Sequence, residues 1–183
     1  TYDYDEMGSP RSFISIGKNW AEVITNPFKL YKGFTTSGGM RSPIIMYGID
    51  NIENRIYDEF ISIIDIAPTI YSLTESDSEN KVTGESIVPF LKKNQEYIHD
   101  ENYVFAFEHS GSSILIKDKW KIVNNSIPFN LNDFELYLLS DISETNNLKN
   151  EQSEIYKLLR KDWESFVQTN KIILPTPYRD DLN

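Results

Sequence analysis

The stretch Asn26-Pro-Phe-Lys-Leu-Tyr-Lys-Gly-Phe-Thr-Thr-Ser-Gly-Gly-Met-Arg-Ser-Pro43 joins an apolar-flanked lysine, a Gly-Gly pair and an arginine within eighteen residues. We call residues 26–43 the lysine segment. A Gly-Gly pair permits positive φ angles or a close approach of two backbone stretches, so it predicts a compact turn. The ammonium group of Lys32 is a compact point charge, which suits a tetrahedral oxyanion without the planar fork of an arginine. The segment therefore makes Lys32 a candidate anion-binding residue.

The two basic residues of the lysine segment each have a structural alternative. Lys32 can be a surface lysine whose aliphatic stem covers Phe28 or Phe34. Arg41 can be a second oxyanion contact, but an arginine after Gly-Gly more often orders the turn through carbonyl or carboxylate groups. We therefore expect a structural role for Arg41.

Composition excludes several classes of function. The chain has 183 residues, a net charge of −10 and no cysteine, which removes disulfides, thiolate zinc sites and cysteine nucleophiles. Its lysines and arginines are scattered and the net charge is negative, so we expect no nucleic-acid partner. No run approaches eighteen apolar residues, so we expect a soluble protein without a membrane span. The opening residues lack the features of a signal peptide, which favours the cytoplasm and suggests a truncated or processed start.

Beyond the lysine segment, the pattern resembles an α/β protein. Ile44–Tyr47 is a short β-prone run of the kind that forms a buried parallel strand. Asp65 precedes Ile66, Ile70 and Leu73 at helical spacing, so we expect its carboxylate to cap a helix by accepting hydrogen bonds from the first free amides. The polar stretch 75–81 is the best candidate boundary in the chain.

The remainder of the chain predicts an antiparallel sheet and one long helix. Four β-prone runs are separated by turn signals, and they lie near Tyr103–Glu108, Ser112–Lys117, Lys119–Val123 and Glu135–Leu139. A helix is expected around Glu151–Gln168, with one apolar stripe that covers a face of the sheet. The stripe consists of Ile155, Leu158, Leu159, Trp163, Phe166 and Val167.

The lysine segment closely resembles the lysine segment of the sulfatases, in which the lysine of a Leu-Tyr-Lys run reaches the sulfate group of the substrate. Lys32 corresponds to that lysine. Three later stretches resemble sulfatase motifs in the family's order: Asp65-Ile-Ala-Pro-Thr69, Ile116-Lys-Asp-Lys-Trp-Lys-Ile-Val123 and Glu135-Leu-Tyr-Leu-Leu-Ser-Asp141. The resemblance runs from about Trp20 to Phe166.

The resemblance implies a fold and a division of the chain. It implies the C-terminal portion of an alkaline-phosphatase-like α/β sulfatase fold, with a small four-stranded antiparallel sheet packed against a long C-terminal helix. Residues 1–76 would be the incomplete end of the large catalytic domain, and residues 82–183 the C-terminal subdomain. The implied activity is hydrolysis of aryl or alkyl sulfate esters, with Lys32 as catalytic and substrate-binding residue.

The resemblance also implies a formylglycine nucleophile and Ca²⁺, whose residues would lie upstream of this chain. No Cys/Ser-x-Pro-x-Arg run occurs here, so we assign no metal ligand and expect the chain alone to be inactive. Its partners would be a small sulfate ester and the remainder of the catalytic domain. Two alternatives remain. One is a phosphate or phosphonate monoester hydrolase of the same superfamily, and the other is a catalytically inactive remnant or interaction module.

Overall fold

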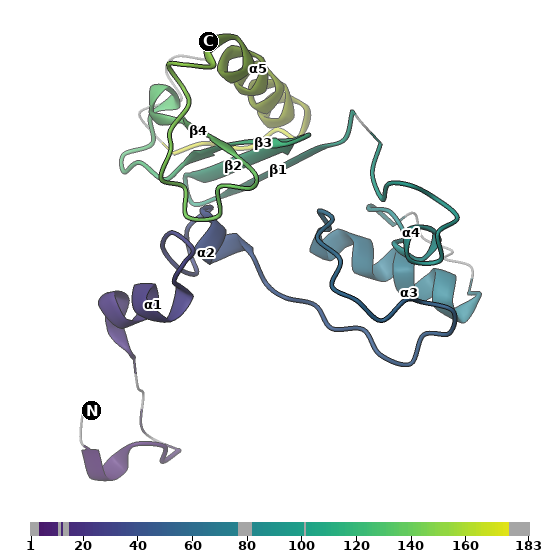
Figure 1. The fold of residues 1–183 in the computed structure, drawn as a ribbon. Coiled ribbons are helices and arrows are strands. Elements are labelled where there is room, and N and C mark those ends of the chain that lie inside the picture. The colour runs from purple at the N-terminus through teal and green to yellow at the C-terminus, as the bar shows by residue number, and fades with distance from the viewer. Residues whose placement is uncertain (1–3, 11, 13–14, 77–81, 101, 176–183) are drawn as a thin grey trace. The chain divides into compact units, whose positions relative to one another are not determined.

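A computed structural model describes residues 4–10, 12, 15–76, 82–100 and 102–175 of the protein (Figure 1). The chain forms two compact units, which are Thr1–Ser42 with Val104–Asn183, and Pro43–Tyr103. The described elements are, in chain order, η1 (Tyr4–Glu6), α1 (Gly17–Thr25), α2 (Ser37–Met40), η2 (Ile63–Asp65), α3 (Ile66–Thr74), α4 (Val88–Leu91), β1 (Val104–His109), β2 (Ser112–Lys117), β3 (Trp120–Asn124), η3 (Leu131–Asp133), β4 (Glu135–Leu138) and α5 (Ser153–Thr169).

The first unit contains an antiparallel sheet with strand order β1-β2-β3-β4, which confirms the predicted meander. Phe105 pairs with Ile116, and Ile116 in turn pairs with Lys121. The turn between β1 and β2 needs positive φ at Ser110 and Gly111, which have φ of 52° and 91°. Short turns of this kind fix the register, so alternate side chains of each strand face opposite sides of the sheet.

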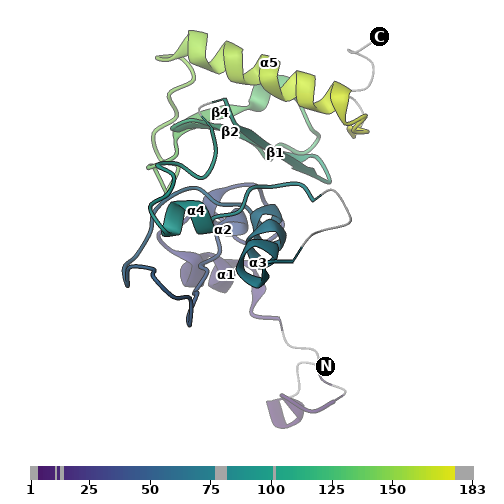
Figure 2. The ribbon, with the colours of Figure 1, turned by 90° about the vertical axis from the view of Figure 1, so that its right-hand side faces the viewer.

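Helix α5 covers one face of this sheet, as predicted (Figure 2). Its buried residues are Tyr156, Leu159, Trp163 and Val167, and the indole of Trp163 is completely buried between Phe129 and Phe134. Leu158 was predicted in this stripe, but it is 48% exposed. At 3.6 residues per turn Leu158 falls on the opposite side of the helix from Trp163, and Tyr156 takes its place in the core.

The lysine segment, with α2 at its end, lies on the opposite face of the sheet from α5 (Figure 1). This face carries a polar and partly charged set of side chains, including Lys121 and Tyr137, which are both only 2% exposed. The sheet is therefore covered on both sides. For this reason the compact unit combines residues near the start of the chain with residues after Val104. The predicted division into 1–76 and 82–183 stays a prediction, because it assigns residues to a larger α/β domain.

The second unit, Pro43–Tyr103, is built around η2, α3 and α4. Its small apolar core consists of Ile87, Leu91 and Ile98, packed with Ile52, Tyr57, Ile61 and Phe90. An apolar hollow of about 70 Å³ lies beside α3, and Met46 lines it together with Ile70 and Ile87. Among the helices that the structure describes, none has both the length and the apolar character needed to cross a membrane.

The predicted strand at Ile44–Tyr47 is wrong for this structure, in which these residues are extended without strand pairing. Ile45 is 92% exposed and Tyr47 is 99% exposed. A strand requires a neighbour that pairs with its backbone, and the described strands of this chain pair only with one another. The run consequently has strand propensity but no partner strand among the described residues.

Candidate functional site: the lysine turn and its supports

Lys32 lies at the tip of a tight turn. The amide of Phe34 donates to the carbonyl of Tyr31 at 3.3 Å, which places Lys32 and Gly33 at the two central positions. Gly33 has φ of 98°, the positive value that a type II turn requires at its third residue. The rings of Tyr31 and Phe34, the first and last residues of the turn, pack edge to face with 5.3 Å between their centroids and stabilise the turn.

The side chain of Lys32 is exposed, and its ammonium group has no hydrogen bond or ion pair with any residue that the structure describes. The ring of Phe28 lies under the guanidinium group of Arg41, at 5.6 Å from its centroid. This contact of Arg41, which follows α2, is with an aromatic ring and not with the carbonyl or carboxylate groups that we expected. The sequence-predicted site therefore contains one cation that is held in place by its backbone and is free at its charged end.

Thr35 connects the turn to the sheet, and Thr36 closes the lysine segment on itself. The hydroxyl of Thr35 donates to the carbonyl of Ser113 at 2.9 Å, and the amide of Thr35 donates to Asn125 Oδ1 at 2.9 Å. The hydroxyl of Thr36 donates back to the carbonyl of Lys29 at 2.8 Å. Thr35 and Thr36 are each 1% exposed, so these bonds form away from water, where an unmade bond would be costly.

Gly38 and Gly39 allow two stretches of backbone to approach closely. This is one of the two roles predicted for the Gly-Gly pair, the other being positive φ angles. A Cβ at Gly38 would overlap the carbonyl oxygen of Leu30, and a Cβ at Gly39 would overlap that of Phe34. The amide of Gly38 donates to the carbonyl of Lys29 at 3.0 Å. The start of α2 is therefore in direct contact with the residues on both sides of Lys32.

A buried ion pair lies at the first residue of α2. Glu144 Oε1 accepts hydrogen bonds from the amide of Ser37 at 2.9 Å, from the hydroxyl of Ser37 at 3.0 Å and from the ammonium group of Lys121 at 2.8 Å. The Lys121 and Glu144 side chains are 3% and 0% exposed. A buried pair of this kind is weak support for net stability, but losing one partner leaves an uncompensated charge.

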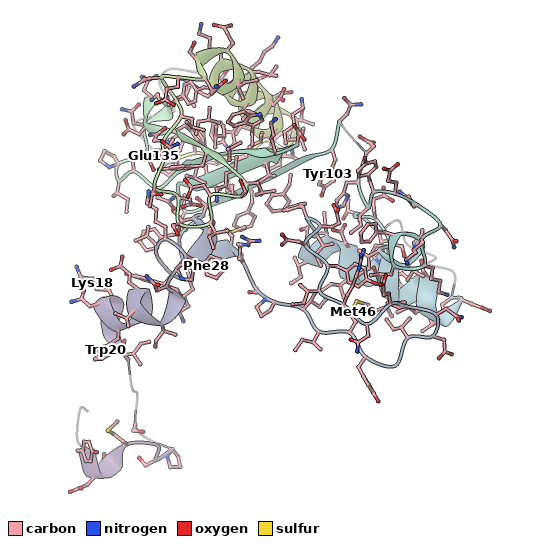
Figure 3. The ribbon with its side chains drawn as sticks, in the orientation of Figure 1. Lys18, Trp20, Phe28, Met46, Tyr103 and Glu135 are labelled. Carbon is pink, nitrogen blue, oxygen red and sulfur yellow. The ribbon has the colours of Figure 1, made fainter. Side chains whose placement is uncertain are left out.

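A second, more exposed group of charges lies beside it. Lys29 Nζ is 3.2 Å from Glu135, which is labelled in Figure 3, and 3.3 Å from the phenol oxygen of Tyr137. It also lies over the ring of Tyr137. Burial raises the pKa of Tyr137, and the negative charge of Glu135 and the hydrogen bond between the two side chains raise it further. Tyr137 is therefore a neutral phenol at physiological pH, and it links the lysine segment to β4.

The second unit has its own buried polar cluster, around Asp65. The carboxylate of Asp65 accepts from the amide of Ser62 at 2.7 Å, from the amide of Glu85 at 2.9 Å and lies 3.1 Å from His99 Nε2. It makes no capping bond to α3, so the predicted N-cap role is wrong. Instead Asp65 holds the chain ahead of α3 and the chain after Gly84 together.

Thr69 and Gly84 complete this cluster. The hydroxyl of Thr69 donates to the carbonyl of Asp65 at 2.6 Å and accepts from the amide of Ile87 at 3.1 Å. Gly84 has φ of 93°, and a Cβ there would lie 2.8 Å from Asp65 Oδ1. The Asp-x-x-Pro-Thr stretch thus provides two polar side chains that dock residues 84–87 against α3.

Comparison with known proteins gives a family for this architecture. A family described as N-sulphoglucosamine sulphohydrolase, C-terminal, matches residues 29–170. The chain belongs to this family of sulfatase C-terminal domains. An uncharacterized sulfatase of Schizosaccharomyces pombe is 31% identical over 169 residues, which are 87% of this chain and 30% of the relative. An arylsulfatase of Klebsiella aerogenes is 27% identical over 90 residues, 48% of this chain and 19% of the relative.

Solved structures confirm the fold of this sulfatase domain. The crystal structure of Ps i-CgsB has a TM-score of 0.64 and 22% identity, over 77% of this chain and 32% of that chain. The same protein in complex with k-i-k-neocarrahexaose also has a TM-score of 0.64, with 20% identity. The predicted sulfatase resemblance and fold class are therefore confirmed. The chain spans less than a third of the length of the curated relatives. The family match, residues 29–170, overlaps most of the predicted region 20–166 and extends four residues beyond it.

Two residues that support the lysine segment, Lys121 and Glu144, were not predicted from the sequence. Lys121 and Glu144 were not singled out, because each looks like an ordinary charged residue in a hairpin or loop. No group of three or more His, Asp or Glu side chains that could hold a metal gathers among the described residues. The expected Ca²⁺ and formylglycine concern residues outside this chain and stay predictions.

Replacement of Gly38 by alanine tests the close approach in the lysine segment. We expect Gly38→Ala to lower the free energy of unfolding by about 1–3 kcal/mol, because the added methyl group meets the rigid backbone at Leu30 rather than a flexible side chain. Urea denaturation measures the change. Gly48→Ala is not a fair control because Gly48 has a positive φ, so we suggest Ser42→Ala. Equal stability of Gly38→Ala and the wild type would show that a methyl group at residue 38 fits beside the Leu30 carbonyl without a shift of the backbone.

The raised pKa of Tyr137 predicts a loss of stability in alkali. Above its ordinary pKa near 10, tyrosine in the unfolded chain loses its proton while buried Tyr137 keeps it, so the unfolded state is favoured as pH rises. The contribution of Tyr137 to the free energy of unfolding is therefore complete below pH 10. Above pH 10 it declines by up to about 1.4 kcal/mol per pH unit. Urea denaturation at pH 9 and pH 11 should show a smaller decline for Tyr137→Phe than for the wild type.

Tyr47→Phe is the matched control, since Tyr47 is 99% exposed and has the same chemistry. Its unfolding free energy should decline with pH as much as that of the wild type. If Tyr137→Phe and Tyr47→Phe behave alike between pH 9 and pH 11, the phenol of Tyr137 ionises as freely in the folded state as in the unfolded state.

Proposed function

We propose that this chain is the C-terminal part of a sulfatase that hydrolyses aryl or alkyl sulfate esters, in which Lys32 binds the sulfate group of the substrate. The observation that carries the proposal is the ammonium group of Lys32. It is exposed and lacks a partner among the described residues, while its turn is anchored by buried hydrogen bonds at Thr35 and Thr36. A cation on a rigid turn, with its charge unused, suits an anionic ligand.

The chemistry of sulfate ester cleavage explains why such a cation is useful. The transition state spreads negative charge over the sulfate oxygens, and a fixed donor lowers the barrier if its contact strengthens as that charge develops. Lys32 would contribute by orienting the sulfate group and by compensating its charge. The family implies that Ca²⁺ and a formylglycine supply electrophilic activation and the nucleophile, from residues outside this chain. On its own, the 183-residue chain should therefore show no turnover.

One alternative activity uses the same cation. A phosphate or phosphonate monoester also presents a tetrahedral anion, and an ammonium group can bind either kind of oxyanion. Matched aryl sulfate and aryl phosphate esters, assayed with the whole protein that contains this chain, separate the two activities. We expect kcat/KM to be higher for the sulfate. A higher kcat/KM for the phosphate would reject sulfatase activity in favour of phosphoryl transfer.

A non-catalytic role is the other alternative. The exposed apolar residues Ile45, Tyr47 and Ile63 favour a chain that needs contact with another polypeptide. An interaction module would use such a surface without chemistry. Failure of the whole protein to turn over any sulfate or phosphate ester, together with an in-frame stop codon upstream of Thr1, would support this role. An open upstream reading frame with a Cys/Ser-x-Pro-x-Arg motif would support the enzyme.

A further inference from the structure

We propose that the buried Lys121–Glu144 ion pair positions Lys32, so that Lys121 and Glu144 are positioning residues for the substrate-binding lysine. The inference rests on the proposed function of Lys32, and it names the residues that hold Lys32 in position for that function. Neither residue touches Lys32. They act through Ser37, the first residue of α2, whose amide and hydroxyl both donate to Glu144 Oε1.

The path from the ion pair to Lys32 is short and tightly packed. Ser37 is followed directly by Gly38 and Gly39, whose backbone meets the carbonyl groups of Leu30 and Phe34 with no room for a methyl group. Those two residues flank the turn that carries Lys32. A displacement of Ser37 therefore moves both sides of the turn, because tightly packed backbone transmits a shift rather than absorbing it.

The charges are arranged so that Ser37 depends on both members of the pair. Glu144 Oε1 receives all three donors, two from Ser37 and one from Lys121. Lys121 Nζ also donates to the Ser37 hydroxyl at 2.8 Å, and the carbonyl of Asp141 lies at 3.5 Å. If Glu144 lost its charge, Lys121 would remain buried without a counter-charge, and the segment would open to let water reach it.

Glu144 is itself held in a fixed conformation. It has φ of 51°, a left-handed backbone that non-glycine residues rarely adopt. Its amide donates to the carbonyl of Asp141 at 3.1 Å, and the carboxylate of Asp141 accepts from the amides of Thr145 and Asn146 at 3.1 and 3.0 Å. The loop after β4 thus presents Glu144 to α2 from a rigid frame.

A second ion pair on the same sheet provides a matched control. Lys117 on β2 lies 2.7 Å from Asp162 on α5, with side chains 27% and 25% exposed. Strand alternation places Lys117 on the face covered by α5, whereas Lys121 points to the lysine segment. Removal of the Lys117 charge therefore perturbs the same sheet without perturbing the support of Lys32.

The first experiment measures amide hydrogen exchange by mass spectrometry in the whole protein that contains this chain. We expect Glu144→Gln to speed exchange in peptides covering residues 33–41 by on the order of 100-fold, and Lys117→Met to leave these peptides within about 3-fold of the wild type. The double variant Lys121→Met/Glu144→Gln should recover part of the protection, because no unpaired charge remains. Wild-type exchange in residues 33–41 of Glu144→Gln would overturn the positioning role.

The second experiment measures kcat and KM for an aryl sulfate. Glu144→Gln should lower kcat/KM by about 10-fold or more, with the loss divided between kcat and KM as it is in Lys32→Ala. In the Lys32→Ala background, Glu144→Gln should lower kcat/KM by less than about 3-fold, because the group that it positions is already absent. An equal loss in both backgrounds would overturn positioning and indicate a general loss of structure.

The two proposals fail in different measurements. Lys32→Ala with wild-type kcat/KM would reject the proposed function of Lys32, whatever the exchange data show. If Glu144→Gln fails to fold in the whole protein, Lys121→Met tests the same pair from its other side, with Lys117→Met as control. Loss of protection in residues 33–41 without any change in kcat/KM would overturn the inference that the pair positions a substrate-binding group.

Discussion

Lys32→Ala in the whole protein should lower kcat/KM for an aryl sulfate by about 10²–10³-fold, the usual effect of removing one fixed oxyanion donor. The ammonium group of Lys32 is exposed at the tip of a turn and has no partner among the described residues, so its removal breaks no internal contact. The loss should therefore appear in catalysis and not in folding. Steady-state kinetics and urea denaturation, done on the same preparation, measure both quantities.

Lys18→Ala is the control for charge. Lys18 lies on α1 in the same compact unit, is exposed like Lys32 and projects from the helix into open space (Figure 3). It should leave kcat/KM unchanged. A general loss of positive charge would lower both variants equally, which would remove the reason to assign sulfate binding to Lys32. Wild-type kcat/KM in Lys32→Ala would reject the assignment outright.

Asp65→Ala should lower the free energy of unfolding of the second unit by about 3–5 kcal/mol, because it removes a buried carboxylate that accepts from two backbone amides and contacts His99. The carboxylate is 1% exposed, so water cannot easily replace it. We expect the amides of Ser62 and Glu85 to lose their protection against hydrogen exchange. Helix α3 should begin and end at the same residues in Asp65→Ala, since the Asp65 side chain makes no hydrogen bond to α3.

Asp58→Ala is the matched control for this prediction, because Asp58 is an exposed aspartate in the same unit. Its unfolding free energy should stay within about 0.5 kcal/mol of the wild type, as is usual for exposed substitutions. If Asp65→Ala were as stable as Asp58→Ala, the carboxylate would not hold residues 84–87 to the chain ahead of α3. A protected Glu85 amide in Asp65→Ala would contradict the same contact more directly.

The sequence allowed prediction of the elements whose signals are local. Strands β1 to β4 alternate or run apolar between clear turns, and α5 carries Trp163 and Leu159 at helical spacing, so their existence and approximate bounds followed from periodicity. The motif around Lys32 also predicted a turn and a close glycine contact where the structure has them. These features depend on neighbours within a few residues.

Features that depend on distant partners could not be predicted. Ile44–Tyr47 has the composition of a strand, but a strand forms only when it pairs with another, and the described strands pair only with one another. Asp65 has the sequence position of a cap, yet its Oδ1 accepts a hydrogen bond from the amide of Glu85, twenty residues further along the chain. Lys121 alternates with apolar residues like a solvent-facing lysine, and only the lysine segment folded over its face makes it buried. No local pattern records these contacts.

The bond between Ser37 and Glu144 spans 107 positions of the chain. A ribosome that adds about 5–20 residues per second needs about 5–20 seconds between these two residues, and throughout that time the lysine turn has no acceptor for Ser37. A premature stop codon between Lys32 and Glu144 would release a polypeptide in which Lys32 is present and its support is missing. Nonsense mutations between Lys32 and Glu144 should therefore lower activity at least as much as Glu144→Gln does, although every residue of the turn that carries Lys32 has been translated.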